Sequence, residues 1–190
     1  MLKRQDILTV LKIVALARRA EAWTYASLAT SLRMSASEVH ACVSRAKCSR
    51  LIGDDPWVSG SIQRPSPRFN HIVRFVTNGL RYVLPVEKGA PTRGMSTSIG
   101  AEPLKNLLLV EGTLCPVWPG KLGSTQGYAF KPVYRSCPQA ARADDDLYQL
   151  LSLADALRDP DAKPREQQLA ASEFAFRCQA SRSLESVISQ

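Results

Sequence analysis

Two short amphipathic segments, with a turn of three residues between them, most constrain how this chain can fold. The apolar positions of the first segment recur at helical spacing: Leu28, Ala29 and Leu32. Ser35 and Glu38 then form the S-x-x-E pattern of a capping box, which predicts the start of a second helix. The inner face of that helix repeats at i, i+3, i+4 and i+7: Val39, Cys42, Val43 and Ala46. Because the turn is short, we expect the two helices to cross steeply.

The remaining face of the second helix is polar and basic. It is predicted to point outward and to consist of Ser37, His40, Ala41, Ser44, Arg45 and Lys47. A thin helix face of this chemistry suits the major groove of double-stranded DNA, which is wide enough to admit an α-helix.

The stretch 23–52 resembles the winged helix-turn-helix of bacterial transcription regulators of the MarR-like kind. The residues that stand at the family's pattern are Leu28–Ala29, Met34–Ser35, Ser37, Val39 and Leu51–Ile52. The resemblance covers roughly the first half of the chain and implies a DNA-binding fold. One position departs from the family, because Arg33 occupies the turn where Gly is usual. If the backbone there is left-handed, Arg costs about 1–2 kcal/mol. A plain three-helix domain with the same periodicity is the alternative.

The segments on either side fit the same domain. Residues 5–20 are predicted to form a first helix, whose wide apolar surface could pack on other helices or form a dimer contact. Thr24 is the predicted N-cap of the next helix. A Ser-Gly-Ser turn predicts a short hairpin over residues 58–62, the wing, with Arg64 and Arg68 beside it. A loop that contacts phosphates is the alternative to that hairpin.

The middle of the chain is harder to interpret. Residues 69–77 are predicted to form a helix that ends at Asn78–Gly79, and residues 81–86 to form a strand. Residues 85–103 are rich in Pro and Gly, show no helix or long strand pattern, and are predicted to be a connecting loop. Within it, Arg93 resembles an arm that reaches a minor groove. Neither glycine-rich phosphate-loop pattern occurs, which disfavours nucleotide binding.

Short elements are predicted in the next segment. Residues 104–110 form a short helix or strand, and strands are expected at 117–118 and 127–134. Aromatic side chains supply core material there: Trp118, Tyr128, Phe130 and Tyr134. These side chains could line a small-molecule pocket, or they could pack around a loop-rich layer.

The last part of the chain is predicted to be helical. Asp144, Asp145 and Asp146 open a helix at Leu147, and a role at the helix N-terminus is favoured over a metal site. A break at residues 159–161 precedes a final helix that begins near Pro164, so the two helices form an αα-hairpin. The predicted fold class is α+β, mostly α. Its parts are a winged helix-turn-helix domain over 1–84, a loop and short-strand region over 85–143, a helical hairpin over 144–180 and a frayed tail over 181–190.

Charge is distributed unevenly along the chain, whose net charge is +8. Residues 1–100 hold 15 Lys and Arg against 6 Asp and Glu, a balance of +9, whereas residues 101–190 hold 10 against 11, a balance of −1. Basicity therefore accompanies the predicted helix-turn-helix and points to a polyanionic partner. A basic surface that serves only solubility is the alternative.

Other function classes find little support in the sequence. Only two His residues occur and no Ser-His-Asp arrangement is evident, so we expect no enzymatic activity. The five Cys residues include no C-x-x-C pair, so we expect neither a zinc site nor a disulfide framework, and no cofactor. No run of 18 apolar residues occurs and the N-terminus does not fit a signal peptide, so a cytoplasmic protein without a membrane span is predicted.

The sequence thus predicts a DNA-binding transcriptional regulator, a repressor or an antitoxin-like autoregulator, that acts as a homodimer. The residues predicted to face the bases are Ser35, Ser37, Glu38, His40, Ala41, Ser44 and Arg45, with Arg45 the first choice for a guanine contact. Those predicted to contact phosphates or a minor groove are Thr24, Lys47, Arg50, Arg64, Arg68 and Arg93. The alternative is a protein-interaction module on a winged-helix scaffold, which would bind a partner protein such as a neighbouring toxin or enzyme.

Overall fold

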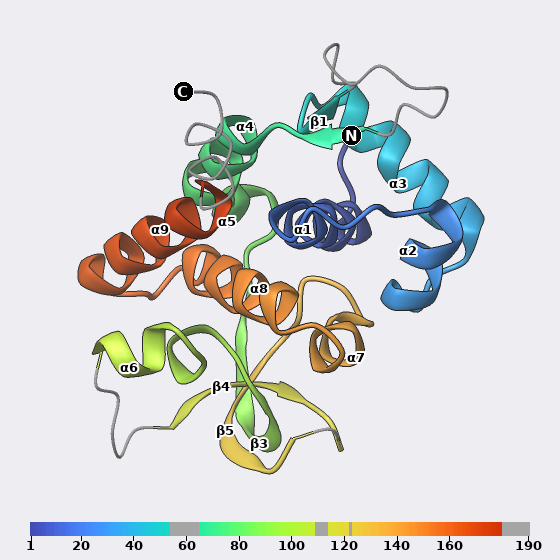
Figure 1. Ribbon diagram of the computed structural model, residues 1–190. Helices are drawn as coiled ribbons and strands as arrows, with labels where there is room; N and C mark the ends of the chain where they lie inside the picture. The colour runs from blue at the N-terminus through green and yellow to red at the C-terminus, as the bar shows by residue number, and fades with distance from the viewer. Residues whose placement is uncertain (54–64, 109–113, 122, 180–190) are drawn as a thin grey trace.

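The computed structural model describes residues 1–53, 65–108, 114–121 and 123–179, and this part of the chain is α+β and mostly helical. Figure 1 shows helix α1 (Arg4–Arg18) in the middle, with α2 (Tyr25–Leu32) and α3 (Ala36–Cys48) on one side of it. Helix α8 (Asp145–Arg158) runs beneath α1, and a small group of strands lies below α8.

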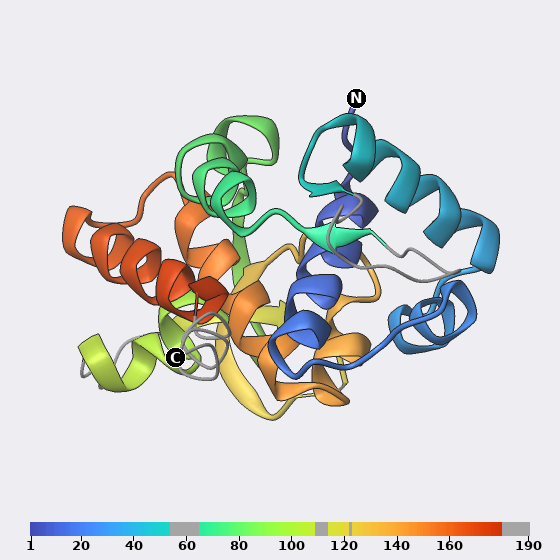
Figure 2. The same cartoon turned by 45° about the horizontal axis from the view of Figure 1, so that its top comes forward.

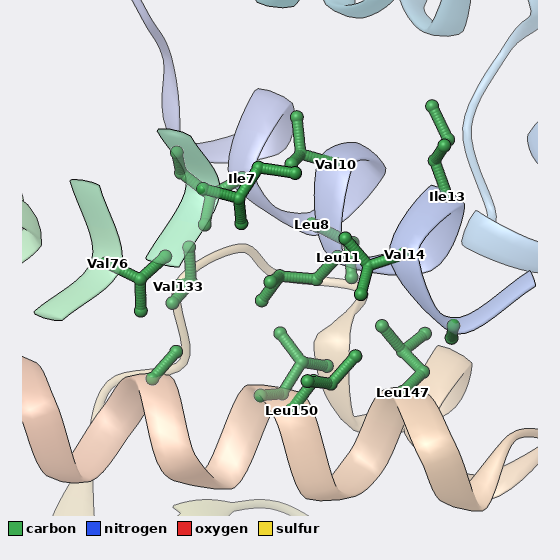
Figure 3. Packing of buried hydrophobic residues seen from close by; sticks show 14 of the residues in the cluster. Ile7, Leu8, Val10, Leu11, Ile13, Val14, Val76, Val133, Leu147 and Leu150 are labelled. Carbon is green, nitrogen blue, oxygen red and sulfur yellow. The ribbon is translucent and has the colours of Figure 1, made fainter. Parts of the chain in front are cut away.

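Helix α1 is buried around its whole circumference, because every residue from Asp6 to Leu16 is buried. A helix that is buried on all sides needs partners on more than one face. It packs on α3 and on α8, and Figure 3 shows Leu11 and Val14 of α1 facing Leu147 and Leu150 of α8. The sequence left two uses for the wide apolar surface of this helix, packing on other helices or a dimer contact. In the structure, α8 of the same chain covers it.

The helices of the N-terminal part begin where the sequence places their caps. Thr24 accepts a hydrogen bond from the backbone of Ser27 at the start of α2, as predicted for this N-cap. After α3, strand β1 (Ile52–Gly53) pairs antiparallel with β2 (Ser66–Pro67). The predicted hairpin over residues 58–62 and Arg64 lie outside the described residues.

The helix that begins at residue 69 continues further than expected. Helix α4 (Phe69–Arg74), the π-helical turn η1 (Phe75–Gly79) and α5 (Leu80–Val83) follow one another without a break. The predicted stop at Gly79 and the strand over 81–86 are therefore wrong. Ile72, Val76 and Leu80 are all buried at a spacing of four residues, so the apolar face persists past Gly79. Burial of Leu80 outweighs the cost of about 1 kcal/mol for a Gly inside a helix.

The loop predicted over residues 85–103 is also wrong, because it contains the nine-residue strand β3 (Lys88–Ser96). Strand β3 pairs antiparallel with both β4 (Cys115–Pro119) and β5 (Thr125–Phe130), and β4 pairs parallel with β5. The three strands close into a small barrel. A register shift between Lys88 and Pro91 accommodates the proline, which has no N–H for the ladder.

Close approach of the strands explains why β3 is rich in glycine. A Cβ atom at Gly94 would collide with the backbone carbonyl of Trp118 on β4, so this position excludes any side chain. The Gly and Pro that suggested a loop thus belong to a tight strand. Trp118 and Phe130, expected as core material, are both buried.

Further helical elements lie beside the barrel and complete the core. The turn η2 (Ser98–Gly100) and helix α6 (Leu104–Leu108) follow β3, and α7 (Cys137–Arg142) precedes α8. Helix α9 (Pro164–Gln179) packs on α8. One buried cluster includes side chains from α1, α3, α5, α7, α8 and α9, so the predicted ranges 1–84, 85–143 and 144–180 share a single core.

A buried ion pair on α8 joins the barrel to the helices. Asp155 and Arg158 are both completely buried, and Arg158 Nε donates to Asp155 Oδ1 at 2.8 Å. The other carboxylate oxygen of Asp155 accepts from Thr97 Oγ1 at 2.7 Å and from Trp118 Nε1 at 2.6 Å. Arg158 also donates to the carbonyl oxygens of Leu84 and Lys131. One turn of α8 therefore forms hydrogen bonds with β4 and with the segments that directly follow α5, β3 and β5.

We expect Asp155→Asn to destabilise the protein by about 3–5 kcal/mol, because the buried Arg158 charge would lose its counter-ion. Asp161→Asn is a matched control, since the Asp161 side chain is 69% exposed and pairs with Lys88 at 3.3 Å; its effect should stay below about 1 kcal/mol. Urea titrations of both variants, followed by circular dichroism, measure the difference. Equal effects would show that the buried pair is not needed for stability.

Candidate nucleic-acid interface

In the turn between α2 and α3, Arg33 adopts a left-handed backbone conformation. Arg33 has φ 55° and ψ 46°, and its backbone N–H donates to the carbonyl of Thr30, while Met34 N–H donates to that of Ala29. These bonds close the C-terminal end of α2. The Arg33 side chain is exposed, so it meets no steric obstacle. The backbone strain expected for Arg33, at a position where the MarR-like family usually has Gly, is thus present, and the fold tolerates it.

A capping box starts α3, as the sequence predicts. Ser35 Oγ accepts from the backbone N–H of Glu38 at 3.2 Å, and Glu38 Oε2 accepts from the backbone N–H of Ser35 at 2.9 Å. The backbone hydrogen bond from Ser35, followed by that from its hydroxyl, holds the pKa of Glu38 below its ordinary value. Ser35 and Glu38, both predicted to face the bases, are therefore engaged in the cap.

The inner face of α3 is also as expected. Val39, Cys42, Val43 and Ala46 are completely or almost completely buried. Burial raises the pKa of Cys42 to about 11, so this thiol remains protonated and packs as a small apolar side chain. The other face of α3 must then be the one that solvent or a partner can reach.

That outward face carries Ser37, His40, Ser44 and Lys47, all of which are exposed, while Ala41 is half-buried beside them. The His40 ring stacks on Tyr25 of α2, with centroids 4.8 Å apart and an interplanar angle of 27°. Tyr25 in turn contacts Trp23 edge to face at 5.6 Å. The aromatic stack fixes His40 in position on an otherwise small and polar surface.

Arg45 does not lie on this outward face, and the prediction that it does is wrong. Its guanidinium forms a bidentate pair with Asp6 of α1, with Nε to Oδ2 at 2.8 Å and Nη2 to Oδ1 at 2.6 Å. The Asp6 side chain is completely buried and that of Arg45 is 24% exposed. The hydrogen bonds that its guanidinium donates to Asp6 raise the pKa of Arg45 further above its usual value. Arg45 therefore fastens α3 to α1.

The residues predicted to contact phosphates fall in different places. Arg50 and Arg68 are exposed near the strand pair that follows α3; the Arg68 guanidinium lies against Gly53 of β1, and the Arg50 carbonyl accepts from His71 Nδ1 at 2.9 Å. Thr24 caps α2. Arg93 belongs to β3, on the other side of α8 from α3 (Figure 1), so the structure does not bring it to this face.

Two further cations lie beside the predicted group. Arg33 is exposed in the turn directly before α3, and Arg74 of α4 lines a hollow with Ser49 and His71 near the end of α3. Arg33 could have been included from its position in the turn alone. Arg74 could not, because its place depends on how α4 packs against the N-terminal helices.

Part of the N-terminal positive charge is neutralised within the chain. Lys12 pairs with Asp144 at 2.5 Å, and Arg19 pairs with Asp144 at 3.0 Å and with Asp146 at 2.7 Å. Burial alone would raise the pKa of Asp144, but hydrogen bonds from Arg19 and Lys12 outweigh it and hold that pKa below the ordinary value. Asp144 also caps α8 at Leu147. The charge asymmetry therefore partly reflects contact between α1 and α8.

Other kinds of site have little support within the described residues. There, no three His, Cys, Asp or Glu side chains come together as metal ligands, and Cys42, Cys48, Cys137 and Cys178 are free thiols. Among the helices that the structure describes, none has both the length and the apolar character needed to cross a membrane. Comparisons with protein-family models, with curated proteins and with solved structures find no match for this chain.

We expect Arg33→Gly to stabilise the protein by about 1 kcal/mol, because Gly adopts the left-handed conformation without strain. Thr30→Gly is the matched control, since Thr30 is exposed within α2 and Gly is less favourable than Thr in a helix by roughly a few tenths of a kcal/mol. Thermal unfolding of both variants shows whether each substitution raises or lowers the stability. Destabilisation by both substitutions would contradict the strain at Arg33.

We expect Arg45→Ala to destabilise the protein by about 3 kcal/mol, because the buried Asp6 carboxylate would lose the cation that pairs with it. Arg50→Ala serves as control: it removes the same charge from an exposed residue just after α3 and should change the unfolding free energy by less than about 0.5 kcal/mol. Chemical unfolding distinguishes them. A stable Arg45→Ala variant would argue against this fastening role.

Proposed function

We propose that this chain is a sequence-specific, double-stranded DNA-binding transcriptional regulator, with residues 1–84 as a winged helix-turn-helix of the MarR-like kind. The observation that carries the proposal is α3. It begins at a capping box, is fastened to α1 through Arg45 and Asp6, and presents a polar outer face. Figure 2 shows α3 at the edge of the molecule.

The outward side chains of α3 suit base recognition in the major groove. Ser37 and Ser44 carry hydroxyls that can donate or accept hydrogen bonds, and His40 is held by its stack on Tyr25. Ala41 between them is small enough to allow close approach. These four residues take over the base-reading role that the sequence assigned first to Arg45.

Cations at both ends of α3 suit the phosphate backbone. Arg33 precedes the helix, and Lys47, Arg50 and Arg68 lie towards its end or just beyond it. Contacts of this kind position a protein on the duplex without reading its sequence, and they make binding depend on salt. The β1–β2 pair follows α3 in the chain, as the wing of a winged fold would. Arg64, in the chain between these two strands, is therefore part of the proposal.

Two copies of the chain would read a palindromic operator as a homodimer, with their α3 helices about 34–36 Å apart. The second apolar side of α1 is covered within the chain, so the proposed dimer uses another surface. We place this regulator, a repressor or an antitoxin-like autoregulator, in the cytoplasm, because the free thiols of Cys42, Cys48, Cys137 and Cys178 suit a reducing compartment.

The test is fluorescence anisotropy with the DNA upstream of the protein's own gene and with a scrambled duplex, at two salt concentrations. We expect selective binding that weakens as salt rises. Ser44→Glu should weaken operator binding by about 1–3 kcal/mol, because it places a carboxylate against the duplex. Lys47→Ala should weaken binding to both duplexes and reduce the salt slope by about 1.

Ser172→Glu is the matched control for Ser44→Glu, since Ser172 is an exposed residue of α9 and the change in net charge is the same. Operator binding by Ser172→Glu should equal that of the unmodified protein. Equal loss in both variants would reduce the effect to net charge and remove α3 from the reading role.

The second candidate is a protein-interaction module on the same scaffold. It is favoured by the internal pairing of Lys12, Arg18 and Arg19 with the acidic run, which weakens the inference from net charge to DNA. Weak binding that is equal for both duplexes would favour this candidate, and a pull-down of partner proteins would follow.

A further inference from the structure

A basic hollow opens between the barrel and the start of α8, on a part of the molecule that the proposed DNA contacts do not use. Its volume is about 730 Å³. Its lining includes Arg93, Met95, Lys121, Thr125, Arg142 and Tyr148. These residues come from β3, β5, the chain before β5, α7 and α8, so only the folded chain brings them together.

The charge of the hollow has one sign. Arg93, Lys121 and Arg142 line it, and no Asp or Glu is among the described residues that do so. The pKa of Tyr148 is raised to about 12, mainly because the side chain is partly buried. The nearby charges of Asp145 and Glu102 act in the same direction. Three cations around one hollow favour an anion between them, because the fields of like charges add.

Hydroxyl groups complete the polar lining. Ser96 Oγ and Thr125 Oγ1 lie 3.2 Å apart across the β3–β5 ladder, and the Tyr148 hydroxyl donates to the Ser96 carbonyl at 2.8 Å. Ser124 is exposed next to Thr125. Hydroxyls and cations are the groups that proteins use to bind phosphate oxygens.

Glycine shapes one wall of the hollow. A Cβ atom at Gly123 would collide with the backbone of Gly94, so two bare backbone segments pack together beside the cations. Among the described residues that line the hollow, none belongs to a glycine-rich loop at the start of a helix. A search of the sequence for phosphate-loop patterns therefore does not detect this site.

We propose that this hollow binds the phosphate group of a small phosphorylated molecule. A volume of about 730 Å³ exceeds the size of phosphate itself and falls in the range of small-molecule sites. The half-buried side chains of Met95 and Tyr148 offer apolar surface for the organic part of such a ligand. The inference goes beyond the proposed function and does not depend on DNA binding by α3.

A free ligand is favoured over the backbone of the DNA that α3 would bind. Figure 1 places the barrel on the other side of α8 from α3. A straight duplex lying along the outward face of α3 would therefore leave the hollow uncovered. Arg93, assigned to a minor groove from the sequence alone, belongs to this separate site.

The probe is inorganic pyrophosphate, titrated into the full chain by isothermal calorimetry at constant ionic strength. We expect one binding event per chain, weakened about tenfold or more by Arg93→Ala and separately by Arg142→Ala, because each removes a charge-assisted hydrogen bond. Lys121→Gln is a third, independent variant. Arg165→Ala, which removes the same charge from an exposed position on α9, should bind pyrophosphate like the unmodified protein. Thermal melting checks that all variants are folded.

A second arm distinguishes the source of the phosphate. A scrambled DNA duplex is titrated into the same variants, and its binding should be the same for Arg93→Ala and Arg165→Ala. Loss of DNA binding in Arg93→Ala without any pyrophosphate binding would assign the hollow to a nucleic-acid backbone and overturn the proposal. Pyrophosphate binding that is absent, or equal in all variants, would overturn it as well.

Discussion

The pairing of Asp155 with Arg158 inside α8 determines how the barrel and the helices are joined. Two buried charges are costly unless their hydrogen-bonding capacity is filled, and here the partners come from several segments. Thr97 follows β3, Trp118 lies on β4, and Arg158 reaches carbonyls that follow α5 and β5 while its guanidinium lies over the Phe130 ring at 5.2 Å. The energetic need to satisfy one ion pair thus sets the position of every strand of the barrel relative to α8.

Local signals explain which elements could be predicted from the sequence. The caps at Thr24, Ser35 and Asp144 act within a few residues, so the starts of α2, α3 and α8 follow from short patterns. The barrel depends on pairing between distant segments, and Gly94 is required there by the backbone of Trp118. A rule that assigns Gly and Pro to loops therefore fails for β3. The rule also fails at Gly79, where it ends the helix. The free energy gained by burying Leu80 outweighs the cost of a Gly inside a helix, so the helix continues into α5.

The candidate interface shows the same limit at the level of single side chains. Periodicity predicted the buried stripe of α3, but Arg45 lies at its edge, next to buried Ala46 and three residues after buried Cys42. At such an edge, only the rotation of α3 against α1 decides whether a side chain faces solvent. The partner that decides it, Asp6, is 39 residues away in the chain. The acidic Asp6, at the start of the long apolar stripe of α1, was the available signal that a cation would have to reach it.

Net charge along the chain describes the surface poorly, because ion pairs redistribute it. The acidic run at the start of α8 faces the cations at the end of α1, so both lose their effect on a distant polyanion. The cations near the ends of α3 and those around the barrel hollow are separated by α8 in the structure. A chain with net charge +8 therefore carries two distinct groups of cations, one near the ends of α3 and one around the hollow. The helical face suits a duplex, and the hollow suits a ligand small enough to enter it.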